Sequence, residues 1–166
     1  TMTRQRSDTP RRSGQSGRSP EAEKLFQAAV QLHRAGRIGE AMAAYAGLLA
    51  GHGDDAAAWA NLGVALKSRD KAEAAAACYR RSLALEPKNA GCLSNLGNAL
   101  RWLGRIKQAE QAHRRAVKVD PDYVQASYNL GLVLYDQGRL DEAVDLFDQV
   151  LEKRPDMQEV LWDRAL

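Results

Sequence analysis

Apolar residues recur along this chain with the spacing of α-helices, and the whole pattern repeats every 34 residues. Within 56–89, Trp59, Leu62 and Leu66 fall on one face of a first helix, and Tyr79 and Leu83 fall on one face of a second. The interval is marked by Asn61, Asn95 and Asn129, by Gly63, Gly97 and Gly131, and by Pro87, Pro121 and Pro155. A fixed period of this length predicts a stack of identical two-helix units, and such a stack presents a binding surface more readily than a catalytic pocket.

The pattern predicts an all-α solenoid of four helix-turn-helix units, which span 22–55, 56–89, 90–123 and 124–157. Residues 1–20 are rich in Arg, Ser, Gly and Pro and show no helical period, so we expect a flexible leader there. Residues 158–166 restart the cycle with Leu161 and Trp162. We expect a partial ninth helix, which either caps the stack or is the truncated start of a fifth repeat.

Recurring residue types within the period have mechanical interpretations. Small residues stand where the two helices of a unit must approach closely, at Ala29, Gly63, Gly97 and Gly131. Rings, with a histidine as one substitute, recur where we expect the space between one unit and the next to be filled, at Tyr45, Tyr79, His113 and Phe147. Glycine recurs at the turn inside each unit, at Gly36, Gly104 and Gly138, and Asp70 takes that place in the second unit. A left-handed residue is expected at this turn.

These features together resemble the tetratricopeptide repeat. The resemblance rests on Trp59, Leu62 and Gly63 in the first helix of the second unit, and on Ala75, Tyr79 and Pro87 after it. Their counterparts in the other units extend it from about Ala22 to Leu166. The resemblance implies a right-handed superhelix whose first helices line a concave face.

The asparagines of the period are the first candidate site. On the concave face that the resemblance implies, Asn61, Asn95 and Asn129 would form a ladder. A carboxamide both donates and accepts hydrogen bonds, so it can pair with a peptide backbone whatever the peptide's side chains are. In this feature the chain is similar to the repeat region of O-linked N-acetylglucosamine transferase-like bacterial proteins, where asparagines hold extended peptides. The alternative is that these amides only bond to neighbouring helices.

A second candidate cluster combines cations, rings and one more amide on the same face. It comprises Lys67, Asn98, Arg101, Trp102, Tyr128 and Tyr135. Cations beside rings suit a ligand with acidic and apolar side chains. The alternative is that Lys67 and Arg101 only solvate the surface. We do not expect the Lys/Asn carboxylate clamp of chaperone-tail binders. Phe26 and Val30 stand at the matching positions of the first unit, and Gln125 and Asn129 replace the basic residues expected later.

The distribution of net charge along the chain limits the classes of partner that we expect. The leader has a net charge of +4, from Arg4, Arg6, Arg11, Arg12 and Arg18 against Asp8. The whole chain has a net charge of +3, so the repeat body is near neutral at −1. A nucleic-acid-binding body is usually basic, so we expect no nucleic-acid partner. No apolar run approaches the roughly 20 residues that span a bilayer, so we expect no membrane insertion.

Sequence spacing indicates no catalytic or metal site. His33, His52 and His113 lack metal-ligand spacing, and His113 is interpreted as a ring substitute in the core. Cys78 and Cys92 do not form a CxxC pair, and no secretory signal opens the chain, so we expect the cytoplasm, no cofactor and no metal.

The leading hypothesis is therefore a non-enzymatic interaction module that binds an extended peptide segment in its concave groove. An acidic segment is one candidate ligand. A second hypothesis makes the chain the N-terminal targeting region of a larger glycosyltransferase, sulfotransferase or methyltransferase that continues after Leu166. A third is a scaffold that self-assembles through its repeat ends into homo-oligomers.

Overall fold

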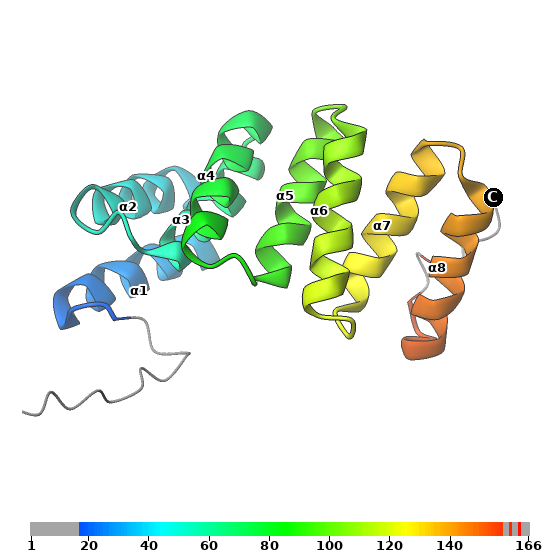
Figure 1. Cartoon of the computed structure of the whole chain (residues 1–166). Coiled ribbons are helices and arrows are strands. Elements are labelled where there is room, and N and C mark those ends of the chain that lie inside the picture. The colour runs from blue at the N-terminus through cyan, green and yellow to red at the C-terminus, as the bar shows by residue number, and fades with distance from the viewer. Residues whose placement is uncertain (1–16, 158–159, 161–162, 164–166) are drawn as a thin grey trace, which may run out of the picture.

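The computed structural model describes residues 17–157, 160 and 163, and in them the chain is an all-α solenoid without strands. Eight helices follow one another in a row (Figure 1): α1 Pro20–Arg34, α2 Ile38–Gly51, α3 Ala56–Lys67, α4 Ala72–Leu85, α5 Ala90–Trp102, α6 Ile106–Val119, α7 Val124–Asp136 and α8 Leu140–Lys153. The predicted fold class is confirmed. Most of the expected leader and ninth helix lies outside the described residues. None of the described helices combines the length and the apolar character needed to cross a bilayer.

Polar side chains start three of the four first helices. The Ser19 hydroxyl accepts a hydrogen bond from the Ala22 amide at 3.2 Å, and the Asp55 carboxylate accepts one from the Ala58 amide at 2.9 Å. Asn89 caps α5 in the same way. These bonds satisfy amides that have no partner inside the helix. Because Ser19 provides the cap and proline is well tolerated at the first helical position, α1 begins at Pro20, two residues before the expected start of the first unit.

A left-handed residue ends the first helix of every pair, as the sequence predicted. Gly36, Gly104 and Gly138 have φ of 73°, 71° and 72°, and Asp70 has φ of 57°. Among the residues that the structure describes, Asp70 is the one non-glycine residue with a positive φ. Glycine adopts this conformation without steric cost, and aspartate is among the few other residues that tolerate it.

Each of the last three pairs is closed by a ring lying on a glycine. A Cβ placed on Gly63 would stand 2.6 Å from Cε1 of Tyr79, and one on Gly97 would stand 2.5 Å from Nε2 of His113. The Phe147 ring lies on Gly131 in the same way. The close approach of the two helices is thus confirmed. These three rings fill the space opposite glycine within their own pair, because the missing side chain leaves room for a ring there. Tyr45, at the matching place of the first pair, also reaches the next unit, where its hydroxyl bonds with Asn61.

Adjacent pairs are also tied by side chains. Arg105 at the start of α6 forms a salt bridge of 2.8 Å with Glu73 of α4. Glu110 of α6 accepts hydrogen bonds from Arg139 at 2.8 Å and from Gln137 at 2.7 Å, both at the turn before α8. Burial raises the pKa of Glu110, but the bonds from Gln137 and Arg139 outweigh it, so the pKa lies below its usual value. The ionised carboxylate therefore joins the third pair to the fourth.

Candidate functional site

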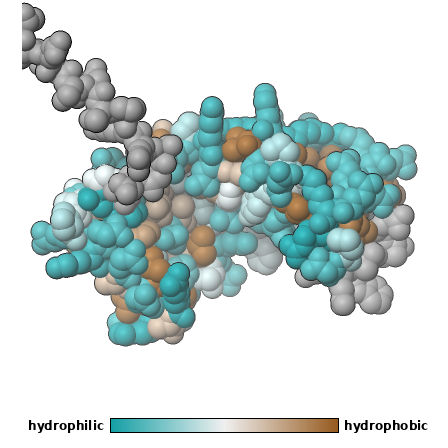
Figure 2. Space-filling view, turned by 90° about the horizontal axis from the view of Figure 1, so that it is seen from below, coloured by the Kyte–Doolittle hydropathy of each residue, from teal (hydrophilic) through white to brown (hydrophobic). Residues whose placement is uncertain are grey.

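The first helices of the pairs form the inner side of the stack. Helix α5 packs closely against α7 and more lightly against α3, whereas no two second helices pack to this extent in the described part. The row therefore bends toward the side of the first helices. Figure 2 shows the resulting body, which is curved along its length. We call the solvent-facing residues of α1, α3, α5 and α7 the inner surface.

Three of the predicted asparagines lie partly open on this surface. Asn61 of α3 and Asn95 and Asn98 of α5 are half-buried. Asn61 also contacts a ring of the preceding pair: burial raises the pKa of the Tyr45 hydroxyl, and a hydrogen bond with the Asn61 side chain opposes that rise.

Asn129 differs from the other three. It is 6% exposed, and its Nδ2 donates to the Ser94 hydroxyl of α5 at 3.1 Å. Its Oδ1 accepts a hydrogen bond from Gln125 at 3.2 Å. The ladder expected along the inner surface therefore does not extend to α7, where the amide joins neighbouring helices instead. The close packing of α5 and α7 is the physical reason.

The cation-and-ring cluster is divided in the same region. Nε and Nη2 of Arg101 donate to the two carboxylate oxygens of Asp136 at 2.5 and 3.1 Å, which joins α5 to α7. The Tyr128 hydroxyl donates to the Asp163 carboxylate at 2.7 Å. Trp102 is 73% exposed, and Tyr135 is 38% exposed. Lys67 is exposed at the end of α3, and no ion pair involves it within the described part of the chain.

An arginine near the chain start was missed by the sequence reasoning. Arg18, assigned to a solvated leader, has a side chain only 9% exposed and forms an ion pair with Asp55, whose side chain is 6% exposed. Burial raises the pKa of Asp55, but hydrogen bonds from Arg18 and the Ala58 amide outweigh it and leave the pKa lowered. The only signal in the sequence is that Arg18 directly precedes the capping Ser19, which holds it close to α1.

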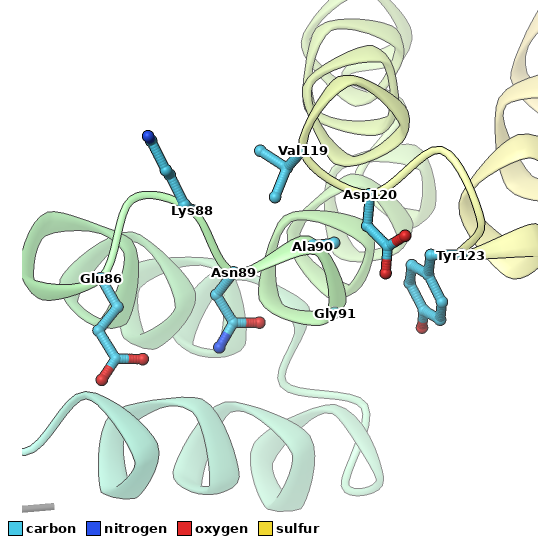
Figure 3. Close-up of a pocket in the computed structure, with 8 residues that line it drawn as sticks. All are labelled: Glu86, Lys88, Asn89, Ala90, Gly91, Val119, Asp120 and Tyr123. Carbon is cyan, nitrogen blue, oxygen red and sulfur yellow. The ribbon is translucent and has the colours of Figure 1, made fainter. Parts of the chain in front are cut away.

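Two depressions lie between successive turns that join the pairs. The larger has a volume of about 570 Å³ and is bordered by the turns after α4 and after α6 (Figure 3); its residues are Glu86, Lys88, Asn89, Ala90, Gly91, Val119, Asp120 and Tyr123. The smaller, about 480 Å³, lies one repeat further along. Asn89 and Asp120 use side-chain oxygens to accept backbone amides at 2.8 and 3.0 Å. The depressions thus follow from the repeat geometry, and their polar groups hold the turns.

Both cysteines and one of the three histidines are buried. Burial raises the pKa of the Cys78 and Cys92 thiols, so both are protonated at neutral pH. His113 is fully buried against Gly97, as its interpretation as a ring substitute predicted, and its pKa is lowered to about 4. The described residues hold no group of three or more His, Cys, Asp or Glu that could bind a metal ion.

Comparison with protein-family models supports the prediction of tetratricopeptide repeats. The description "Tetratricopeptide repeat" matches residues 56–89 with one model and residues 94–158 with another. No curated protein matches the chain.

Solved structures with the same fold are numerous. The MamA protein superposes with a TM-score of 0.80 at 20% identity, over 86% of this chain and 78% of that one. YrrB, described as a repeat protein with an unusual peptide-binding site, gives 0.76 at 24% identity over 86% and 74%. The first repeat domain of Spaghetti (RPAP3), bound to an HSP90 peptide, gives 0.65 at 24% identity over 66% and 87%. At these identities the likeness establishes the fold.

Proposed function

The chain is built from tetratricopeptide repeats, and on that premise we propose that its inner surface binds an extended segment of another polypeptide. The observation that carries the proposal is the combination on α3 and α5. There the half-buried amides of Asn61, Asn95 and Asn98 lie on the same helices as exposed Val64 and Trp102. Amides can pair with the backbone of a segment, and exposed apolar side chains can pack against its side chains.

The relatives support this role without naming a partner. YrrB is described as having a peptide-binding site, and the Spaghetti domain holds an HSP90 peptide. Stacked helix pairs present long concave surfaces that suit such ligands. A protein-interaction role fits this chain for the same reason, and we propose it in place of catalysis.

We place the proposed contact mainly on α3 and α5. Asn129, Arg101 and Tyr128 already bond to Ser94, Asp136 and Asp163. We therefore propose Asn61, Asn95 and Asn98 as the backbone-binding residues, with Lys67, Trp102 and Tyr135 contacting side chains of the segment. Because Arg101 is neutralised by Asp136, an acidic residue in the segment would be recognised mainly by Lys67.

The asparagine pair of α5 gives the test. Peptides selected against the chain from a random display library should bind the double variant Asn95→Ala/Asn98→Ala about ten- to a hundredfold more weakly, since each lost hydrogen bond contributes about 1 kcal/mol. Fluorescence anisotropy of the labelled peptides measures the change. Circular dichroism confirms that the helices persist.

The matched control changes two amides elsewhere. Gln108 and Gln111 of α6 are exposed. The double variant Gln108→Ala/Gln111→Ala removes the same chemistry from a second helix and should leave the affinity unchanged. Equal affinities of the two double variants would contradict the proposed surface.

A further inference from the structure

The side chain of Arg18 is seated in a small pocket at the start of the inner surface. Its Nη2 donates to Oδ1 of Asp55 at 2.7 Å, and its Nε donates to the other oxygen of the same carboxylate. Its Nη1 donates to Glu23 at 3.1 Å. The guanidinium carbon lies 3.6 Å from the centre of the Phe26 ring. Two carboxylates and one aromatic face therefore surround a single guanidinium group.

The receptor groups are held by the fold independently of Arg18. Asp55 is the N-cap of α3, where it also accepts the Ala58 amide. Phe26 packs on the buried core of the first pair and lies 6.2 Å from the Tyr45 ring. Glu23 belongs to the first turn of α1. A planar guanidinium fits this arrangement through a two-bond fork and ring stacking, which the compact ammonium of lysine cannot reproduce.

The pocket is particular to the first junction between pairs. One repeat later, the counterparts of Glu23, Phe26 and Asp55 are Ala57, Ala60 and Asn89. Two repeats later they are Gly91, Ser94 and Tyr123. The 34-residue pattern therefore does not require two acids and a ring to stand together at this place.

We propose that this pocket is an arginine-binding site, which Arg18 fills in cis and from which an arginine of a bound segment displaces it. The polypeptide nature of the ligand rests on the proposed function. The position of Phe26 on α1 would place that arginine at one end of a segment lying along the first helices. Because Arg18 is tethered next to the pocket, it competes at high effective concentration, and an incoming arginine binds well only when other contacts add to it.

A small ligand tests the pocket separately from the rest of the inner surface. N-acetyl-arginine amide should bind the variant Arg18→Ala at least tenfold more tightly than the wild-type chain. NMR shifts of the Phe26 ring protons measure this binding. N-acetyl-lysine amide should not bind either protein. The variant Arg18→Ser, which also removes the guanidinium group and leaves the face of Phe26 open, serves in the same titration if Arg18→Ala does not fold.

Asp55→Asn supplies the matched control. Asparagine caps helices as well as aspartate does, so α3 keeps its start while the pocket loses its charged fork. Arginine binding gained through Arg18→Ala should be lost in Arg18→Ala/Asp55→Asn. Absence of arginine binding to the emptied pocket, or equal binding of the lysine amide, would overturn the inference. Either result would leave the Asn95 and Asn98 test of the proposed function unaffected, and failure of that test would leave the pocket standing.

Discussion

Gly63→Ala should lower the free energy of unfolding by about 2–3 kcal/mol, because the added methyl group overfills a closed interface. Its Cβ would stand 2.6 Å from Cε1 and 2.9 Å from Cδ1 of Tyr79. The Tyr79 ring is fully buried and cannot move aside without disturbing the helices around it. Urea denaturation followed by far-UV circular dichroism measures the loss.

The same substitution at Gly47 should have the opposite sign. Gly47 lies inside α2, and nothing is within 4 Å of the Cβ that alanine would add. Replacing a helical glycine by alanine in open space should raise the stability by about 0.5–1 kcal/mol. If Gly63→Ala were stabilising too, the ring-on-glycine closure of the pairs would be wrong.

Acid should destabilise the chain well before its carboxylates titrate, because His113 is buried in its neutral form. Burial is the main cause that lowers the pKa of His113 to about 4, and the charge of Arg101 adds to it. The imidazole of the unfolded chain titrates near 6.5, so between these values the unfolded state binds the extra proton. The free energy of unfolding should therefore fall by about 2 kcal/mol between pH 8 and pH 5 and by about 3 kcal/mol at pH 4.

His113→Phe separates this effect from other titrations. Neither ring nitrogen of His113 has a hydrogen-bond partner among the described residues, and the fourth pair has Phe147 at the same place. The variant should gain about 1–2 kcal/mol at pH 7, since no polar group is left buried without a partner. Its stability should be nearly constant from pH 8 to pH 5. A wild-type fall of stability retained in the variant would show that another group causes it.

Periodicity allowed the fold to be predicted. The small residues, the rings and the turn residues obey local rules of packing and backbone conformation, so they can be recognised without coordinates. The left-handed Asp70 and the buried His113 were placed correctly because each stands where the period has glycine or a ring. The contact of Tyr79, His113 and Phe147 with the glycine of their own pair was not predicted, because a period states that positions are equivalent without stating which neighbour each one faces.

The details of the inner surface could not be predicted from the period. The contacts that join successive first helices are Ser94 with Asn129 and Arg101 with Asp136, and each spans 35 residues. Tyr128 and Asp163 have the same spacing. Neighbouring first helices are offset along their axes, so in these contacts a residue bonds to the position one after its equivalent in the next repeat. An alignment of equivalent residues, 34 positions apart, does not pair these side chains and so predicts them to be exposed. In the structure they are bonded to each other.

The Arg18 pocket could not be predicted from the 34-residue period for a different reason. Its groups come from the residue before the cap of α1, from α1 itself and from the cap of α3, and Arg18 and Asp55 are 37 residues apart. Composition indicated only that the leader is basic. The pairing of one of its arginines with two specific acids depends on where the first two pairs meet.

Photo-crosslinking from the inner surface tests the central claim most directly. A photoreactive phenylalanine analogue replaces Val64, which is 37% exposed on α3, or Ala77, which is exposed on α4. Each protein is irradiated with a display-selected peptide and analysed by mass spectrometry. The account predicts that the peptide is captured from position 64 and not from position 77. Capture from position 77 with none from position 64 would contradict it.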